Sequence, residues 1–141
     1  MVVLCYDSFM NTCIFCRIAT GEIPAHTVWE NKQFVAFLDL KPNNPGHLLV
    51  VPREHIPYVF DLGEPLYSET FQVAKQLAGP LQLVTQAKRI GLVVEGFGVD
   101  HTHLHLIPIN QGGELDSHYA QEAKSEDLEQ MAARLREEIA R

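Results

Sequence analysis

Three histidines of this chain stand at alternate positions, at His101, His103 and His105, and apolar residues follow them. Successive side chains of a β-strand point to opposite faces. A strand here would place the three imidazoles on one face and Thr102 and Leu104 on the other. We therefore expect one face of this segment to carry chemistry and the other to pack in the core.

The chemistry that suits such a row is nucleophilic attack on phosphorus. A neutral imidazole is a competent nucleophile near pH 7 because its ordinary pKa is about 6.5. Attack would give a covalent phosphohistidine, with water as the second nucleophile. Adjacent imidazoles cannot all be protonated cheaply, so one stays neutral while another stabilises charge or donates a proton. A solvated face or a scavenging metal patch is the alternative, which the apolar flanks disfavour.

A second group of candidate residues begins with Cys13 and Cys16, a C-x-x-C pair. This spacing lets two thiolates reach one tetrahedral ion, and two histidines would complete a closed structural zinc site. His55 and His101 are the best placed of the histidines. A pair of part-buried free thiols is the alternative. A thioredoxin-like redox role is disfavoured because no βαβ unit surrounds the pair.

Two further residues stand where strands are expected to begin or end. His47 starts the third expected strand, where it is either an edge residue or a side chain facing the histidine row. Asp39 ends the second strand. Its carboxylate either supports the following turn by an Asx-type hydrogen bond or accepts hydrogen bonds from both hydroxyls of a ribose.

Composition narrows the function classes. The chain has 141 residues, enough for one domain with a real core, and a formal net charge of −7. That charge argues against broad binding to a nucleic acid polymer or an anionic membrane. No segment reaches the apolar length of a membrane span or has the pattern of a secretory signal, so we expect a cytoplasmic protein. Neither a phosphate-binding P-loop nor the carboxylate cluster of a magnesium phosphotransferase is present.

Hydrophobic periodicity predicts a mostly antiparallel α+β fold with helices packed on one face of the sheet. In chain order we expect strands at 27–30, 34–38 and 47–52, a helix at 65–88, strands at 91–95 and over the histidine row, and a helix at 125–140. Gly79-Pro80 should kink or briefly break the first helix. The expected organisation is an N-terminal extension (1–12), a domain (13–110) and a C-terminal loop and helix (111–141).

These residues together resemble the histidine triad (HIT) family. Its signature of alternating histidines and mostly hydrophobic residues is similar to residues 101–107, and residues 13–108 resemble the family's other segments in order. The matching segments are Cys13-Ile-Phe-Cys16, Gly21-Glu-Ile-Pro-Ala25, Ala36-Phe-Leu-Asp39, Pro42, Pro45-Gly-His47 and Val51-Pro-Arg-Glu-His55. The resemblance implies a five-stranded antiparallel sheet with a helix between strands three and four.

The resemblance also implies roles for the candidate residues. His103 would be the nucleophile that takes a nucleoside monophosphate from the substrate, His105 would contact the phosphate, His47 would orient the triad and Asp39 would hold the ribose. Substrates in the family are nucleoside phosphoramidates, dinucleoside polyphosphates or related adenylated compounds, so a purine nucleotide such as AMP is the expected ligand, and many members are homodimers.

The resemblance extends to zinc. Some members bind it through a C-x-x-C pair and two histidines, which implies Cys13, Cys16, His55 and His101 here. His101 would then also brace the segment that presents His103.

Two departures from the family pattern bear on function. Typical phosphoramidase members carry a longer loop before the triad, with glycine, serine and asparagine, whereas residues 95–100 are short and acidic here. Thr102 also replaces an expected hydrophobic residue. The acidic loop favours a second hypothesis, a regulatory nucleotide-binding module with little turnover. A third is a zinc-stabilised interaction protein whose histidines serve only structure.

Overall fold

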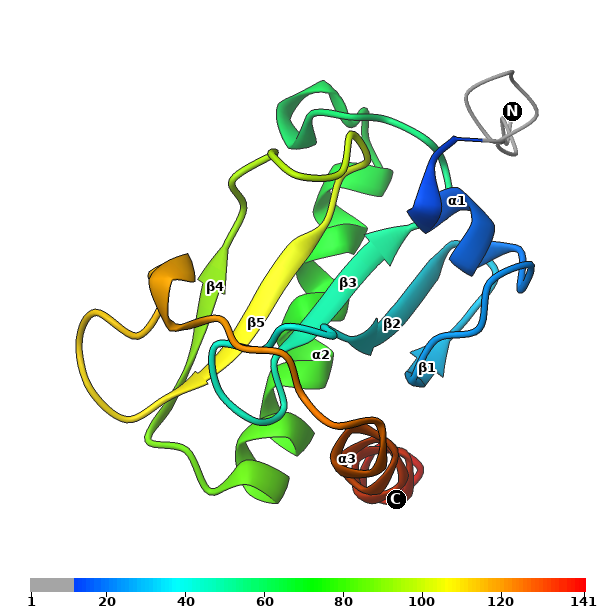
Figure 1. The fold of residues 1–141 in the computed structure, drawn as a ribbon. Helices are drawn as coiled ribbons and strands as arrows, with labels where there is room; N and C mark the ends of the chain where they lie inside the picture. Colours follow the sequence, from blue (N-terminus) through cyan, green and yellow to red (C-terminus); the bar gives the residue numbers. More distant parts are fainter. Residues whose placement is uncertain (1–11) are drawn as a thin grey trace.

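The computed structural model describes residues 12–141, and its centre is a five-stranded antiparallel sheet in the order β1-β2-β3-β5-β4 (Figure 1). The strands are β1 (Thr27–Glu30), β2 (Phe34–Leu38), β3 (Leu48–Pro52), β4 (Arg89–Val93) and β5 (Leu104–Ile109). The predicted extension over residues 1–12 lies outside the described residues, apart from Thr12. The α+β fold predicted for the chain is confirmed.

Three α-helices surround the sheet: α1 (Ile14–Ala19), α2 (Leu66–Thr85) and α3 (Ser125–Ile139). Short 3-10 helices lie at Val59–Asp61 and Ser117–Tyr119. In Figure 1, α2 runs behind the sheet and α3 lies beside it, where it packs against α2 and β1. Both the helix between strands three and four and the C-terminal helix were predicted. Across residues 12–141, no helix combines the length and apolar character that crossing a bilayer requires.

The two faces of the sheet bury different cores. Because β2 and β3 are continuous apolar runs, their side chains are buried on both faces. One face, with Ala36 and Val50, packs against the apolar stripes of α2 and α3. The other, with Phe37 and Leu49, packs against α1 and its two cysteines. The candidate site lies on this second face, away from the main helical core.

Helix α1 was not predicted, and α2 is more regular than predicted. In α1, the Cys13 sulfur accepts a hydrogen bond from the Cys16 N–H at 3.4 Å and so caps the helix. In α2, a kink or a short break was predicted at Gly79-Pro80, and the break is excluded because the helix is continuous through Pro80. Leu77 and Leu81 flank that proline and are almost fully buried, so tertiary packing offsets the lost hydrogen bond.

The histidine row is not one continuous strand. Strand β5 begins at Leu104, so only His105 lies within it. Before it, both the N–H and the hydroxyl of Thr102 donate hydrogen bonds to the Ile56 carbonyl, at 2.9 and 2.6 Å. These bonds hold the segment against the loop that follows β3, out of reach of the sheet ladder. The predicted strand 91–95 is also displaced, since β4 begins and ends two residues earlier, where Arg89 pairs with Ile109.

Gly46 should be intolerant of a side chain. Its φ is +94°, and a Cβ there would lie 2.7 Å from the Thr85 side chain. We expect Gly46→Ala to lower the free energy of unfolding by about 1–3 kcal/mol through strain and overpacking.

The matched control is Gly79→Ala, since Gly79 lies in a helix with open space around it. This change should raise stability by about 0.5–1 kcal/mol. Denaturant titration of both variants checks the contrast, and equal effects would contradict it.

Candidate active site and metal centre

A cavity of about 800 Å³ opens on the second face of the sheet. His103, His105 and Asp39 line it on the sheet side, while α1 contributes Phe15 and Ile18 as an apolar wall. Strand pairing explains this grouping. His105 pairs with Leu49 of β3 on one side and Val93 of β4 on the other, so its ring stands in a row of side chains that face α1. The cavity therefore combines an apolar wall with a few convergent polar groups.

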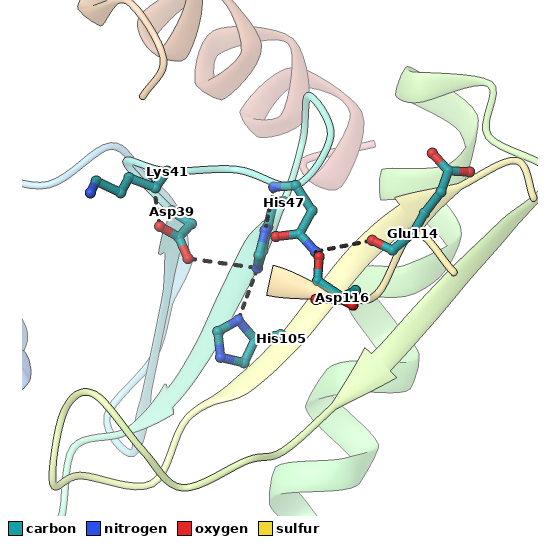
Figure 2. Close-up of polar contacts among 7 residues, drawn as sticks. Asp39, Lys41, His47, His105, Glu114 and Asp116 are labelled. Carbon is teal, nitrogen blue, oxygen red and sulfur yellow. Dashed lines mark hydrogen bonds and ion pairs between the residues drawn. The ribbon is translucent and has the colours of Figure 1, made fainter. Parts of the chain in front are cut away.

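A chain of hydrogen bonds orients His105 (Figure 2). The Asn43 backbone N–H donates to His47 Nδ1 at 3.0 Å, so the neutral His47 ring carries its hydrogen on Nε2. That Nε2 lies 2.9 Å from His105 Nδ1 and 3.6 Å from an Asp39 carboxylate oxygen. His105 Nδ1 must then accept, which leaves the His105 hydrogen on Nε2. One tautomer of each ring follows from a single backbone amide.

The ring of His103 has the opposite tautomer, with its hydrogen on Nδ1. Its Nδ1 lies 2.7 Å from the His101 carbonyl oxygen, which can only accept. Nδ1 therefore carries the hydrogen, and Nε2 of a neutral ring keeps its lone pair. The His103 and His105 rings are 5.0 Å apart between centroids. A nucleophilic nitrogen and a hydrogen-bond donor thus stand side by side at the cavity.

Burial keeps the orienting histidines neutral. It lowers the pKa of His47 to about 4, against the opposing attraction of Asp39. Burial also lowers the pKa of His105, and the adjacent His103 adds to the decrease. Near neutral pH both rings are therefore uncharged, as the hydrogen-bond directions require.

The loop that supplies the Asn43 amide is itself anchored. The Asn43 side chain donates to the carbonyls of Glu114 and Asp116, each at 3.0 Å (Figure 2). Asn44 donates to a Glu114 carboxylate oxygen at 2.7 Å and to the Pro108 carbonyl at 2.8 Å. The orientation of His47 thus depends on contacts with the loop after β5.

Cys13, Cys16, His55 and His101 form a group that can hold a metal ion, with ligand atoms within 4.8 Å of one another. The His101 Nδ1 lies 3.4 Å from the Cys13 sulfur, 3.5 Å from the Cys16 sulfur and 3.2 Å from His55 Nδ1. Ligand atoms around a tetrahedral zinc ion are separated by about 3.3–3.8 Å. The spacing in the protein fits that arrangement.

The position of the hydrogen on the His101 ring also suits a metal ion at this group. The His101 Nε2 donates to the Pro52 carbonyl at 2.6 Å, so its Nδ1 lone pair faces the cysteines. A second group, Asp39, His47 and His105, is also close enough to hold an ion. There, the Asn43 amide fixes the His47 hydrogen on Nε2. A metal ion in this group would need the lone pair of that same nitrogen. The two soft sulfurs and the imidazole nitrogens beside them favour the first group.

Phe15 links the two sites. It lies between the two cysteines in sequence, and its ring packs edge-on against His101 and His103 at centroid distances of 6.1 and 5.0 Å. A residue held by the cysteine pair therefore contacts both a candidate metal ligand and the candidate nucleophile.

The structure brings all the sequence-predicted site residues into these two adjacent groups. Two other histidines, His26 and His118, lie outside the metal group. His26 instead lines the cavity, 3.1 Å from a Glu129 carboxylate oxygen. Sequence reasoning missed Asn43, Asn44 and Glu114, because asparagines between prolines indicate only a turn.

The burial of His47 predicts a pH dependence of stability. Between pH 6.5 and about 4, the unfolded chain binds a proton at this residue that the folded chain does not. Stability should therefore fall as the pH falls through this window, by up to about 1.4 kcal/mol per unit. Denaturant titrations of the wild type and His47→Asn at several pH values isolate the effect. An unchanged pH slope in the variant would contradict it.

Comparisons with known proteins all indicate the same family. The HIT domain family model matches residues 20–112. Protein hit of Bacillus subtilis is 31% identical over 92% of this chain and 96% of its own length. An adenosine 5′-monophosphoramidase of Saccharomyces cerevisiae is 36% identical over 68% of this chain, which spans 61% of that protein.

A solved structure adds a metal to the comparison. A Zn-bound histidine triad family protein from Mycobacterium smegmatis superposes with a TM-score of 0.79 at 26% identity, covering 92% of this chain and 94% of that one. The family match, the relatives and the fold agree with one another. This chain belongs to the HIT family.

Proposed function

We propose that the protein is a nucleotidyl hydrolase or transferase. It acts on nucleoside phosphoramidates or dinucleoside polyphosphates through a covalent nucleotidyl-His103 intermediate. The observation that carries this proposal is the hydrogen bond from His103 Nδ1 to the His101 carbonyl, because it leaves the Nε2 lone pair available beside the cavity. The adenosine 5′-monophosphoramidase activity of the yeast relative supports the substrate class.

The first step forms a bond from His103 Nε2 to phosphorus. The bond from phosphorus to the leaving nitrogen breaks, its electron pair stays on that nitrogen, and the nitrogen takes a proton from solvent. In the second step, water attacks phosphorus, the bond to Nε2 breaks, and the water gives one proton back to solvent. The net change is addition of one water across one P–N bond, or across one P–O bond when the leaving group is a nucleotide.

The other residues bind and orient. The Nε2–H of His105 donates a hydrogen bond to a phosphoryl oxygen, where negative charge develops during attack. His47 fixes the tautomer of His105. Asp39 accepts hydrogen bonds from ribose hydroxyls, since its carboxylate lines the cavity and is a quarter exposed. The apolar wall of α1 suits a purine base such as that of AMP.

A nucleotide-binding regulatory module with little turnover is the second candidate function. The observation that favours it is the acidic Glu95 on the cavity wall, where typical phosphoramidase relatives are expected to supply phosphate contacts. This candidate predicts tight binding of nucleotide without covalent capture.

We further propose zinc as the structural metal at Cys13, Cys16, His55 and His101, consistent with the zinc-bound relative. By bracing His101, the bound ion would steady the carbonyl that orients His103. A homodimer, a cytoplasmic location and the boundaries of the domain at residues 13–110 stay predictions.

His103→Ala should abolish release of AMP from adenosine 5′-phosphoramidate, because the attacking nitrogen is removed. Acid quenching of the wild type during turnover should trap nucleotide on the protein, detected by mass spectrometry. His118→Ala is the control, since His118 is exposed and lies outside the described cavity lining. AMP release by His103→Ala at the wild-type rate would contradict the covalent mechanism. Nucleotide binding without release by the wild type would support the regulatory module.

Purified protein should contain about one zinc ion per chain, the capacity of one four-ligand site. Cys16→Ser should lose that ion, and its melting temperature should fall because the closed site contributes folding energy. Metal analysis and thermal melts check both effects, with Cys5→Ser as the control because Cys5 is the third cysteine of the sequence. Full zinc content in Cys16→Ser would rule out this group as the metal site.

A further inference from the structure

Glu95 lies two residues beyond the end of β4 and lines the cavity with the candidate catalytic histidines. Val93 pairs with His105 in the antiparallel ladder, and side chains two residues apart share a face. The ladder ends at this pair, but Glu95 follows Val93 by only two residues and stays close enough to His105 for its charge to act on that ring. Both histidines and Glu95 line the same cavity. The negative charge of Glu95 also opposes the lowering of the His105 pKa, as a nearby carboxylate must.

The charges around the cavity are otherwise satisfied or absent. Among the described residues that line it, none is Lys or Arg. Asp39 accepts the Lys41 N–H at 2.9 Å and approaches His47. Glu129, on α3, is paired with both His26 and Arg136. Glu95 forms no ion pair with a described residue, so its charge remains available to a bound ligand.

We propose that Glu95 is a specificity residue that selects substrates whose leaving group carries a positive charge. The substrate class is a nucleoside 5′-phosphoramidate of a diamine or another basic amine. This inference rests on the proposed function. Glu95 is exposed and outside the nucleotide wall formed by α1, so it acts on the part of the substrate that departs.

The same charge disfavours the other substrate class. A dinucleoside polyphosphate would bring several negative charges of its leaving nucleotide toward Glu95, with no lining Lys or Arg among the described residues to compensate. Because both effects are Coulombic and close to solvent, each should be modest and should weaken as salt is added. Selectivity through apolar packing would not respond to salt in this way.

The test uses three adenosine 5′-phosphoramidates of equal length, made from ethylenediamine, propylamine and β-alanine, whose leaving groups are cationic, neutral and anionic. For the wild-type protein, kcat/KM for the cationic substrate should exceed that for the neutral one by about three- to fivefold, with a similar decrease for the anionic one. Diadenosine triphosphate should be poorer still. Added NaCl should bring the three phosphoramidate values together.

Glu95→Gln should remove the charge preference while it keeps AMP release from the propylamine substrate. Glu129→Gln is the matched control, a neutralised carboxylate on another wall of the cavity, and it should retain the preference. Equal rates for all three substrates in the wild type, or an unchanged preference in Glu95→Gln, would overturn the proposal. An equal loss of preference in Glu129→Gln would overturn the specific role of Glu95.

The wild-type salt series decides the question if Glu95→Gln fails to fold, because a preference that does not respond to salt contradicts the proposal. Release of AMP from none of the substrates would instead refute the proposed function, and with it this inference.

Discussion

The contact between His103 Nδ1 and the His101 carbonyl is the constraint on which the site depends. A histidine can attack through only one nitrogen, and that nitrogen must be free of hydrogen. Fixing the hydrogen on Nδ1 meets this need without a carboxylate partner. The same residue, His101, turns its side chain toward the two cysteines. One residue thus serves both groups. The backbone carbonyl of His101 orients the candidate nucleophile, and its side chain belongs to the candidate metal centre.

The two faces of the sheet have different roles, one in stability and the other in chemistry. The larger core, between the sheet and helices α2 and α3, lies on one face, and the cavity lies on the other with α1. Because strand side chains alternate, neighbouring residues of one strand serve different tasks. Leu104 and Leu106 are buried in the helical core while His105, between them, faces the cavity. A rigid strand therefore positions His105, whereas the segments that lead into β3 and β5 position His47, His101 and His103.

The strength of each local pattern decides how far sequence reasoning reaches. Continuous apolar runs such as residues 34–38 predict a buried strand well, and the row of histidines identifies the family. Three features were not predictable. The extent of β5 depends on Thr102 bonding to a distant loop, α1 is too short for a periodic signal, and Pro80 is tolerated only because its neighbours are buried. Each outcome is decided by tertiary contacts, which one sequence does not display.

The chain from the Asn43 amide through His47 to His105 points all its hydrogens the same way. Added together, these bonds form a line of dipoles whose positive end faces the cavity. Attraction to a dipole falls with distance more steeply than attraction to a full charge. A phosphate would therefore feel this line only once seated, and its approach through solvent would be governed by the acidic surroundings. The site would then discriminate between ligands only after they make contact. Long-range attraction would not concentrate other anions at the cavity.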